Sequence, residues 1–142
     1  MEIQTKFHGI LNINENNIID FKYGIPGFEQ ETKFIILELF EGSAYKVLQS
    51  IQHSYVAFIM VDPWMFESSY EFDLKESVIE ELQIESPQQL EIYSIMTILE
   101  DFSKSTINLL APIIIHRDEN IGMQVVLEGT TYTTKYAIRT EG

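Results

Sequence analysis

Apolar and polar residues alternate with a period of two along most of the chain. In residues 18–23, Ile19, Phe21 and Tyr23 fall on one face, and the polar residues between them fall on the other. Other segments rich in β-branched and aromatic residues are 33–40, 45–50, 56–61, 90–99, 109–116 and 123–128. This pattern predicts β-strands. The short polar gaps between the segments favour an antiparallel barrel or sandwich over a sheet of alternating strands and helices.

One segment, about residues 73–85, has a helical period instead. Its apolar positions fall on one side of a helix, and they are Leu74, Val78, Ile79 and Leu82. Asp73 is a candidate N-cap that forms a capping box with Glu76, and Pro87 is expected to end the helix. We therefore predict a mostly-β fold, an antiparallel β-barrel-like single domain over residues 1–142 with one short α-helix.

Length and composition narrow the class of protein. A chain of 142 residues buries roughly two-thirds of its unfolded surface, so it needs no disulfide or structural metal to fold. It contains no cysteine, which excludes disulfides and thiolate metal sites. The N-terminus lacks the pattern of a signal peptide, and no apolar stretch approaches the roughly 20 residues of a membrane span. We expect a cytoplasmic protein with no membrane contact, and a monomer as the simplest assembly.

Charge is the most unusual global property of the sequence. Nine Lys and Arg stand against 22 Asp and Glu, which gives a formal net charge of −13. Such a surface repels nucleic-acid backbones and attracts basic partners in a salt-dependent way. Direct nucleic-acid binding is therefore not expected, although acidity is also common in proteins that it merely keeps soluble.

The sequence FKYGIPGF at 21–28 could be a phosphate-binding loop or a structural corner. A phosphate loop needs several inward N–H groups, usually at a helix N-terminus. Here Pro26 lacks an N–H, and the segment that follows is a predicted strand. Pro26 and Gly27 suit the two central positions of a type II turn. We predict a corner that fixes the fold.

Catalytic patterns are weak throughout the sequence. The three histidines, His8, His53 and His116, lie far apart and lack metal-site spacing, so we expect them at the surface or the rim. No nucleophile elbow is present, and a glycosidase-like carboxylate pair cannot be recognised from sequence. We predict no catalytic residue, no metal and no cofactor. A small barrel that binds a ligand or a sugar, possibly as a hydrolase, is the alternative, and a purely structural subunit is a third.

Residues 62–81 contain the most informative polar pattern. Acidic residues gather there with only Lys75 to offset them, and the candidate partner-binding residues are Glu71, Asp73, Glu76, Glu80 and Glu81. Glu76 and Glu80 repel each other at helical i,i+4 spacing, and a basic partner would relieve that repulsion. A solvated helix face is the simpler interpretation. The preceding residues 64–66, Trp-Met-Phe, either tuck under their loop or form a contact patch, and we expect burial.

Several blocks, in order along nearly the whole chain, resemble the FliW family of flagellar assembly factors. They are FHGIL at 7–11, FKYGIPGFE at 21–29, LQS at 48–50, VAFIMVDP at 56–63, Tyr70-Glu71, INLLAPIII at 107–115, GMQVVL at 122–127 and Tyr132. Each block is weak alone, and their order and spacing make the resemblance specific.

The resemblance implies a small, mostly-β protein without catalytic activity that works through two protein contacts. FliW-like proteins bind the translational repressor CsrA and keep it off flagellin messenger RNA, and they also bind newly made flagellin. Flagellin that accumulates occupies the FliW-like protein and releases the repressor, so that synthesis follows assembly. CsrA must carry a basic surface to bind RNA, which suits a partner of net charge −13. We expect the acidic residues 71–81 to face CsrA, and an apolar groove or strand edge to receive flagellin.

Overall fold

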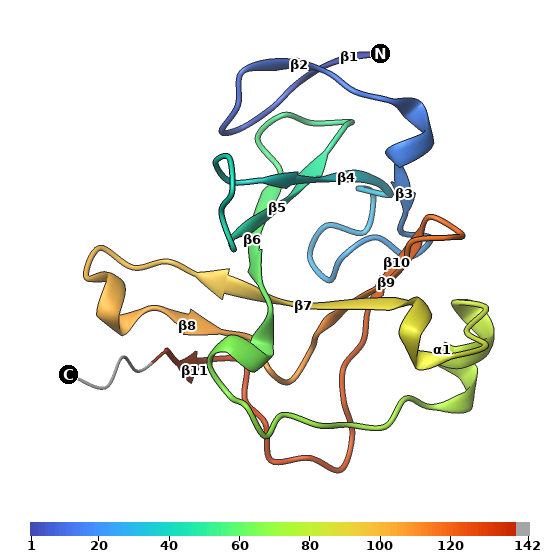
Figure 1. Ribbon diagram of the computed structural model, residues 1–142, viewed down its shortest axis with the longest axis vertical. Coiled ribbons are helices and arrows are strands. Elements are labelled where there is room, and N and C mark those ends of the chain that lie inside the picture. Colours follow the sequence, from blue (N-terminus) through green and yellow to red (C-terminus); the bar gives the residue numbers. More distant parts are fainter. Residues whose placement is uncertain (139–142) are drawn as a thin grey trace.

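Seven strands of the computed structural model, which describes residues 1–138, pair into a closed ring (Figure 1). In chain order they are β3 (Ile19–Asp20), β4 (Lys33–Glu38), β5 (Lys46–Ser50), β6 (Ala57–Val61), β7 (Leu90–Thr97), β9 (Ile113–His116) and β10 (Ile121–Gln124). Consecutive strands are neighbours from β3 to β7, and the pairing of β7 with β9 closes the ring. The predicted mostly-β barrel with one short helix is confirmed.

The prediction of a purely antiparallel barrel needs one correction. β10 runs parallel to β3, with Ile121 opposite Asp20, while the other pairs of the ring are antiparallel. The reason is geometric. Strand direction can alternate around a closed ring only when the number of strands is even, so a ring of seven must contain a parallel pair.

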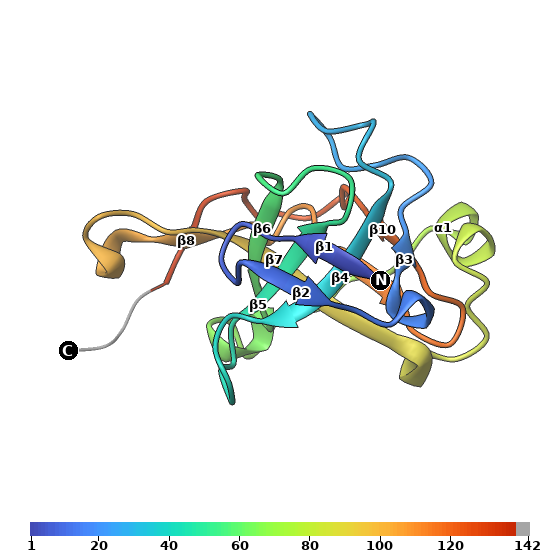
Figure 2. The ribbon, with the colours of Figure 1, turned by 90° about the horizontal axis from the view of Figure 1, so that it is seen from above.

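Short strands that the sequence pattern did not predict extend the barrel at two places. β1 (Glu2–Gln4) and β2 (Ile10–Asn12) form a separate hairpin, which lies over β4 and β5 when the molecule is seen from above (Figure 2). β8 (Thr106–Ile107) and β11 (Tyr136–Ala137) continue the outer end of β7 into a projecting arm. With two or three residues each, these strands are too short to show a period.

The hairpin is tied to the barrel by the side chain of Gln49. Its buried amide accepts a hydrogen bond from the Lys6 N–H at 3.0 Å, and donates to the carbonyls of Ser50 at 2.9 Å and Ser54 at 3.1 Å. The His8 ring also bonds the carbonyls of residues 38 and 39. These bonds give the Gln49 amide, the Lys6 N–H and several strand-end carbonyls partners within the protein.

Buried side chains form two clusters on opposite faces of the strands. Ile113 and Ile115 of β9 belong to one cluster and Ile114 to the other, because successive side chains of a strand point to opposite faces. The first cluster, which includes Phe34 and Met60, fills the barrel. The second lies outside the barrel wall and is covered by the chain between β6 and β7, through residues such as Tyr70, Val78 and Leu82.

Residues 62–89 connect β6 to its antiparallel neighbour β7 and carry most of the helical structure. The connection contains η2 (Pro63–Met65), α1 (Glu76–Glu81) and η3 (Pro87–Gln89); the other 3₁₀ turns are η1 (Glu15–Asn17) and η4 (Phe102–Lys104). Neighbouring antiparallel strands need only about two to five linking residues. A connection of this length is therefore an elaboration of the barrel, and it carries the predicted partner-binding residues.

The predicted helix exists but is shorter than 73–85, and both of its end signals were wrong. Lys75 occupies the N-cap without a side-chain hydrogen bond, so the capping box of Asp73 and Glu76 does not form. The helix ends at Glu81, before Pro87, and Gln83 just beyond the C-cap has a left-handed φ of 55°. The N–H groups of Gln83 and Ile84 bond the carbonyls of residues 80 and 79, which is the Schellman pattern.

Candidate functional site

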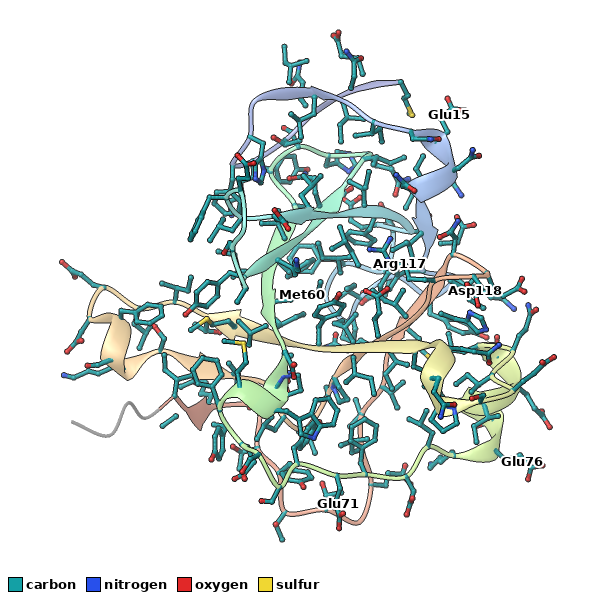
Figure 3. All side chains as sticks on the ribbon, in the orientation of Figure 1. Glu15, Met60, Glu71, Glu76, Arg117 and Asp118 are labelled. Carbon is teal, nitrogen blue, oxygen red and sulfur yellow. The ribbon has the colours of Figure 1, made fainter. Side chains whose placement is uncertain are left out.

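The five predicted partner-binding residues are all exposed and lie on the lead-in to α1 and on α1 itself. Figure 3 shows Glu71 along the loop before the helix and Glu76 at its first residue, at separate places on the surface. Lys75, the cation among them, is paired with Glu128 at 2.6 Å. Its ammonium group is therefore paired with a carboxylate that lies after β10 and outside the predicted set.

The structure places four of these five residues in two groups. Glu71 and Asp73 line an apolar groove, whereas Glu80 and Glu81 face a shallow hollow on the opposite side of α1. Glu81 accepts a hydrogen bond of 2.7 Å from the hydroxyl of Tyr23. That hydrogen bond, with smaller contributions from desolvation and the carboxylate charge, raises the pKa of the Tyr23 phenol. The helix is thus anchored to the 21–28 corner by one of its own carboxylates.

The groove has a volume of about 470 Å³ and is built almost entirely from the β6–β7 connection and the start of β7. Apolar side chains make its floor and walls, and they are Trp64, Tyr70, Phe72, Leu74, Ile79, Ile84, Pro87, Leu90 and Ile92. Most of them are half-buried and pack on the outer core cluster. Carboxylates stand at the rim, where Glu85 joins Glu71 and Asp73. The sequence pattern identified two of these carboxylates and suggested an apolar groove or strand edge, but it did not locate the groove.

We expected residues 64–66 to be buried, but they are not buried as a unit. Phe66 is half-buried against the outer core cluster, but Trp64 is 38% exposed and Met65 is 51% exposed. The Trp64 indole N–H donates to the carbonyl of Tyr70 at 2.7 Å, and the two rings lie 5.4 Å apart. The hydrogen bond fixes the indole at one wall of the groove while leaving part of its face accessible.

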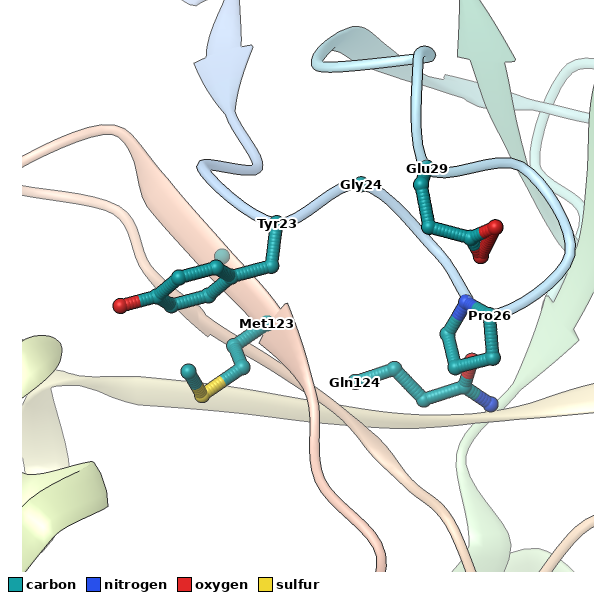
Figure 4. A pocket seen from close by; sticks show the side chains of 7 residues that line it. Tyr23, Gly24, Pro26, Glu29, Met123 and Gln124 are labelled. Atoms are coloured by element: carbon teal, nitrogen blue, oxygen red, sulfur yellow. The ribbon is translucent and has the colours of Figure 1, made fainter.

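The 21–28 sequence is a corner, as predicted. Gly27 has a φ of 87°, and the N–H of Phe28 bonds the carbonyl of Ile25, which is the hydrogen bond of a β-turn with Gly27 in its second central position. A pocket of about 250 Å³ lies between this corner and β10 (Figure 4). The Glu29 carboxylate lines that pocket and accepts the N–H of Gly27. A phosphate would meet this negative charge and find that N–H already bonded.

The three histidines lie apart, and one expectation about them was wrong. His116 is buried and not at the surface, because this last residue of β9 lies between Leu90 of β7 and Ile121 of β10. His53 bonds the buried carboxylate of Glu31 at 2.6 Å, and the Ser50 hydroxyl donates to the same carboxylate at 2.9 Å. Because Ser50 donates to the carboxylate and not to the imidazole, these three residues do not form the nucleophile–base pair that acyl transfer needs.

A metal centre and a membrane-spanning helix are two other features that residues 1–138 could contain. No group of three or more His, Cys, Asp or Glu in that range is arranged to hold a metal ion. No helix there is long and apolar enough to cross a membrane. The groove and its acidic surroundings are therefore the candidate site that the described part of the chain offers.

Comparison with known proteins identifies the family. The family model described as FliW protein matches residues 2–138. The chain belongs to the FliW family. A flagellar assembly factor FliW of Bacillus subtilis (strain 168) is 50% identical over 138 residues, which cover 97% of this chain and 96% of the relative. The flagellar assembly factor FliW of Bacillus licheniformis is 47% identical with the same coverage.

The fold of FliW is shared as well. A crystal structure of the flagellar assembly factor FliW matches this structure with a TM-score of 0.94 and 36% sequence identity, and the match covers 99% of each chain. The resemblance inferred from the sequence blocks is confirmed. Because the FliW family match spans residues 2–138, it includes the whole β6–β7 connection as well as the barrel.

Proposed function

We propose that this protein is a non-catalytic, cytoplasmic flagellar assembly factor that binds the translational repressor CsrA and flagellin. In this scheme it relieves repression of flagellin translation while flagellin is being exported, and releases CsrA when flagellin accumulates. Membership of the FliW family over residues 2–138, beside relatives named flagellar assembly factors, is the observation that carries the proposal.

The surface of the described residues supports partner binding of this kind. A net charge of −13 attracts a basic RNA-binding protein and repels the RNA that competes for it. The acidic residues of α1 are exposed, and Lys75 is engaged elsewhere. We assign the CsrA contact to this acidic surface: Glu71, Asp73, Glu76, Glu80 and Glu81.

Binding of purified CsrA to a charge-reversed variant tests the assignment. Replacing Glu71, Glu76 and Glu80 by Lys should weaken binding by about tenfold or more at low salt, and less at high salt, because exposed charges are screened. The matched control replaces Glu15, Glu100 and Glu119, which are also exposed, by Lys. It changes the net charge equally and should retain more affinity.

Two results would contradict the proposal in different ways. Equal losses in the two triple variants would show that CsrA senses the net charge and not the α1 surface. Absence of both CsrA and flagellin from a pull-down with the unmodified protein, made from an extract of motile cells, would contradict the function itself.

A further inference from the structure

The groove between the β6–β7 connection and β7 is an uncovered part of the hydrophobic core. Phe72, Leu74, Ile84, Leu90 and Ile92 line it, and each also packs on the buried outer cluster. Ile79 of α1 is 37% exposed at its wall. Clefts of several hundred Å³ lined mainly by apolar side chains, with a few polar groups, are the usual form of a binding site.

The charges around the groove restrict what can cover it. Glu71, Asp73 and Glu85 line the groove, and among the described lining residues there is no Lys or Arg. A segment that covers the apolar floor therefore brings its flanks against carboxylates. Acidic flanks would be repelled and basic flanks attracted, with a net charge of −13 adding to both effects.

The nature of the floor also restricts the backbone of the occupant. The side chains that line the groove are mostly apolar, and apolar side chains offer no hydrogen-bond partners. A segment buried on it must satisfy its own N–H and C=O groups, and an α-helix does so within itself. Apolar residues at helical spacing on one face, with Lys or Arg beside them, would meet both the floor and the rim.

We propose that this groove binds an amphipathic helix of a partner protein, with basic residues flanking its apolar face. The proposal deepens the function proposed above and rests on it for the identity of the partner, which we take to be a terminal helix of flagellin. The chemistry proposed for the groove does not depend on that function. That chemistry can be measured with the protein alone and synthetic peptides.

The chain supplies its own reporter for the measurement. Trp64 is the single tryptophan of the sequence and lies at the wall of the groove, so peptides without Trp can be titrated by its fluorescence. The probe is a designed Leu/Lys peptide longer than about 15 residues, with Leu at helical spacing. One control replaces every Lys by Glu, and another scrambles the same residues so that no apolar face forms.

The Leu/Lys helix is expected to change Trp64 emission saturably, and the Leu/Glu and scrambled peptides are not. Replacing Ile79 by Gln should weaken binding of the peptide and of purified flagellin by about tenfold or more. The same replacement at Ile98, which is 44% exposed on the β7–β8 arm, is the control and should leave both affinities unchanged.

A rim variant tests the charge argument separately. Asp73→Asn with Glu85→Gln should weaken the Leu/Lys peptide and flatten its salt dependence, compared with Glu100→Gln and Asp118→Asn elsewhere on the surface. Equal binding of the scrambled peptide, or unchanged affinity of Ile79→Gln with a native circular dichroism spectrum, would overturn the groove proposal. If flagellin fails to bind while the peptide behaves as expected, the groove stands and the identity of its partner is wrong.

Discussion

The two glycines of the corner allow steric demand to be separated from backbone conformation. Gly24 has a φ of 65° and Gly27 a φ of 87°, so each is left-handed. A Cβ on Gly24 would lie 2.7 Å from the main-chain atoms of Glu29, whereas a Cβ on Gly27 would have nothing within 4 Å. Alanine at either position is strained by the left-handed conformation. Only at Gly24 must the backbone also move to make room for the Cβ.

The expected losses in the free energy of unfolding differ by the cost of the steric clash at Gly24. A left-handed L-residue costs roughly 1–2 kcal/mol, which is the full prediction for Gly27→Ala. Overpacking against a fixed neighbour adds about 1–3 kcal/mol, so Gly24→Ala should lose about 2–5 kcal/mol. For a domain of this size each kcal/mol corresponds to a Tm change of roughly 2–4 °C.

Urea unfolding followed by Trp64 fluorescence measures both variants against the unmodified protein. The m-values should stay equal, since neither change alters the surface exposed on unfolding. Equal losses for the two alanine variants would refute the argument, because they would show that the approach of Glu29 to Gly24 imposes no constraint beyond φ.

Three further changes test other parts of the fold. Gln49→Met should lower the free energy of unfolding by about 2–4 kcal/mol in urea titrations, because it leaves main-chain groups at the top of the barrel without partners. Gln30→Met, which changes an exposed side chain, is the control. Similar losses in the two variants would contradict the prediction. Tyr70 donates a buried hydrogen bond to the carbonyl of Leu109, and burial raises the pKa of its phenol in the folded state. The stabilisation from the neutral Tyr70 phenol is therefore complete below about pH 10 and is lost as the pH rises further. Tyr70→Phe should therefore lose less stability at alkaline pH than the unmodified protein. An unchanged dependence of stability on pH would count against burial as the cause. Gln83→Gly should raise the free energy of unfolding by about 1 kcal/mol by relieving the left-handed conformation, and a lower Tm in calorimetry would contradict this.

The long strands could be predicted because each spans several alternations of one period. β4 through β7 lie within the predicted segments, since burial on one or both faces leaves a pattern of β-branched and aromatic residues. The parallel pair of β3 and β10 could not be predicted in this way. It rests on a register of one residue, Ile121 opposite Asp20, which the closure of the ring imposes and the local sequence does not encode.

The helix ends show a different limit. The residue types expected at helix ends are present at Asp73, Glu76 and Pro87. Tertiary contacts can override such local signals. The chain from 71 to 75 instead lies extended along the groove, and α1 begins where Val78 and Leu82 can reach the outer core cluster. A left-handed Gln83 is unusual enough that no residue-type rule would have placed the end of the helix there.

The proposed partner-binding surface was the least predictable part because its elements share no period. Its acidic residues are visible as a run of like charges, but a run alone does not tell a solvated face from the rim of a site. The distinction comes from the apolar residues beside them, Leu74 and Ile79, which a helical pattern assigns to the core and the structure places at the groove. Most of the groove lining falls within the β6–β7 connection, and the remainder is the start of β7. We therefore expect partner recognition to reside in this connection, and the barrel to hold its two ends at β6 and β7.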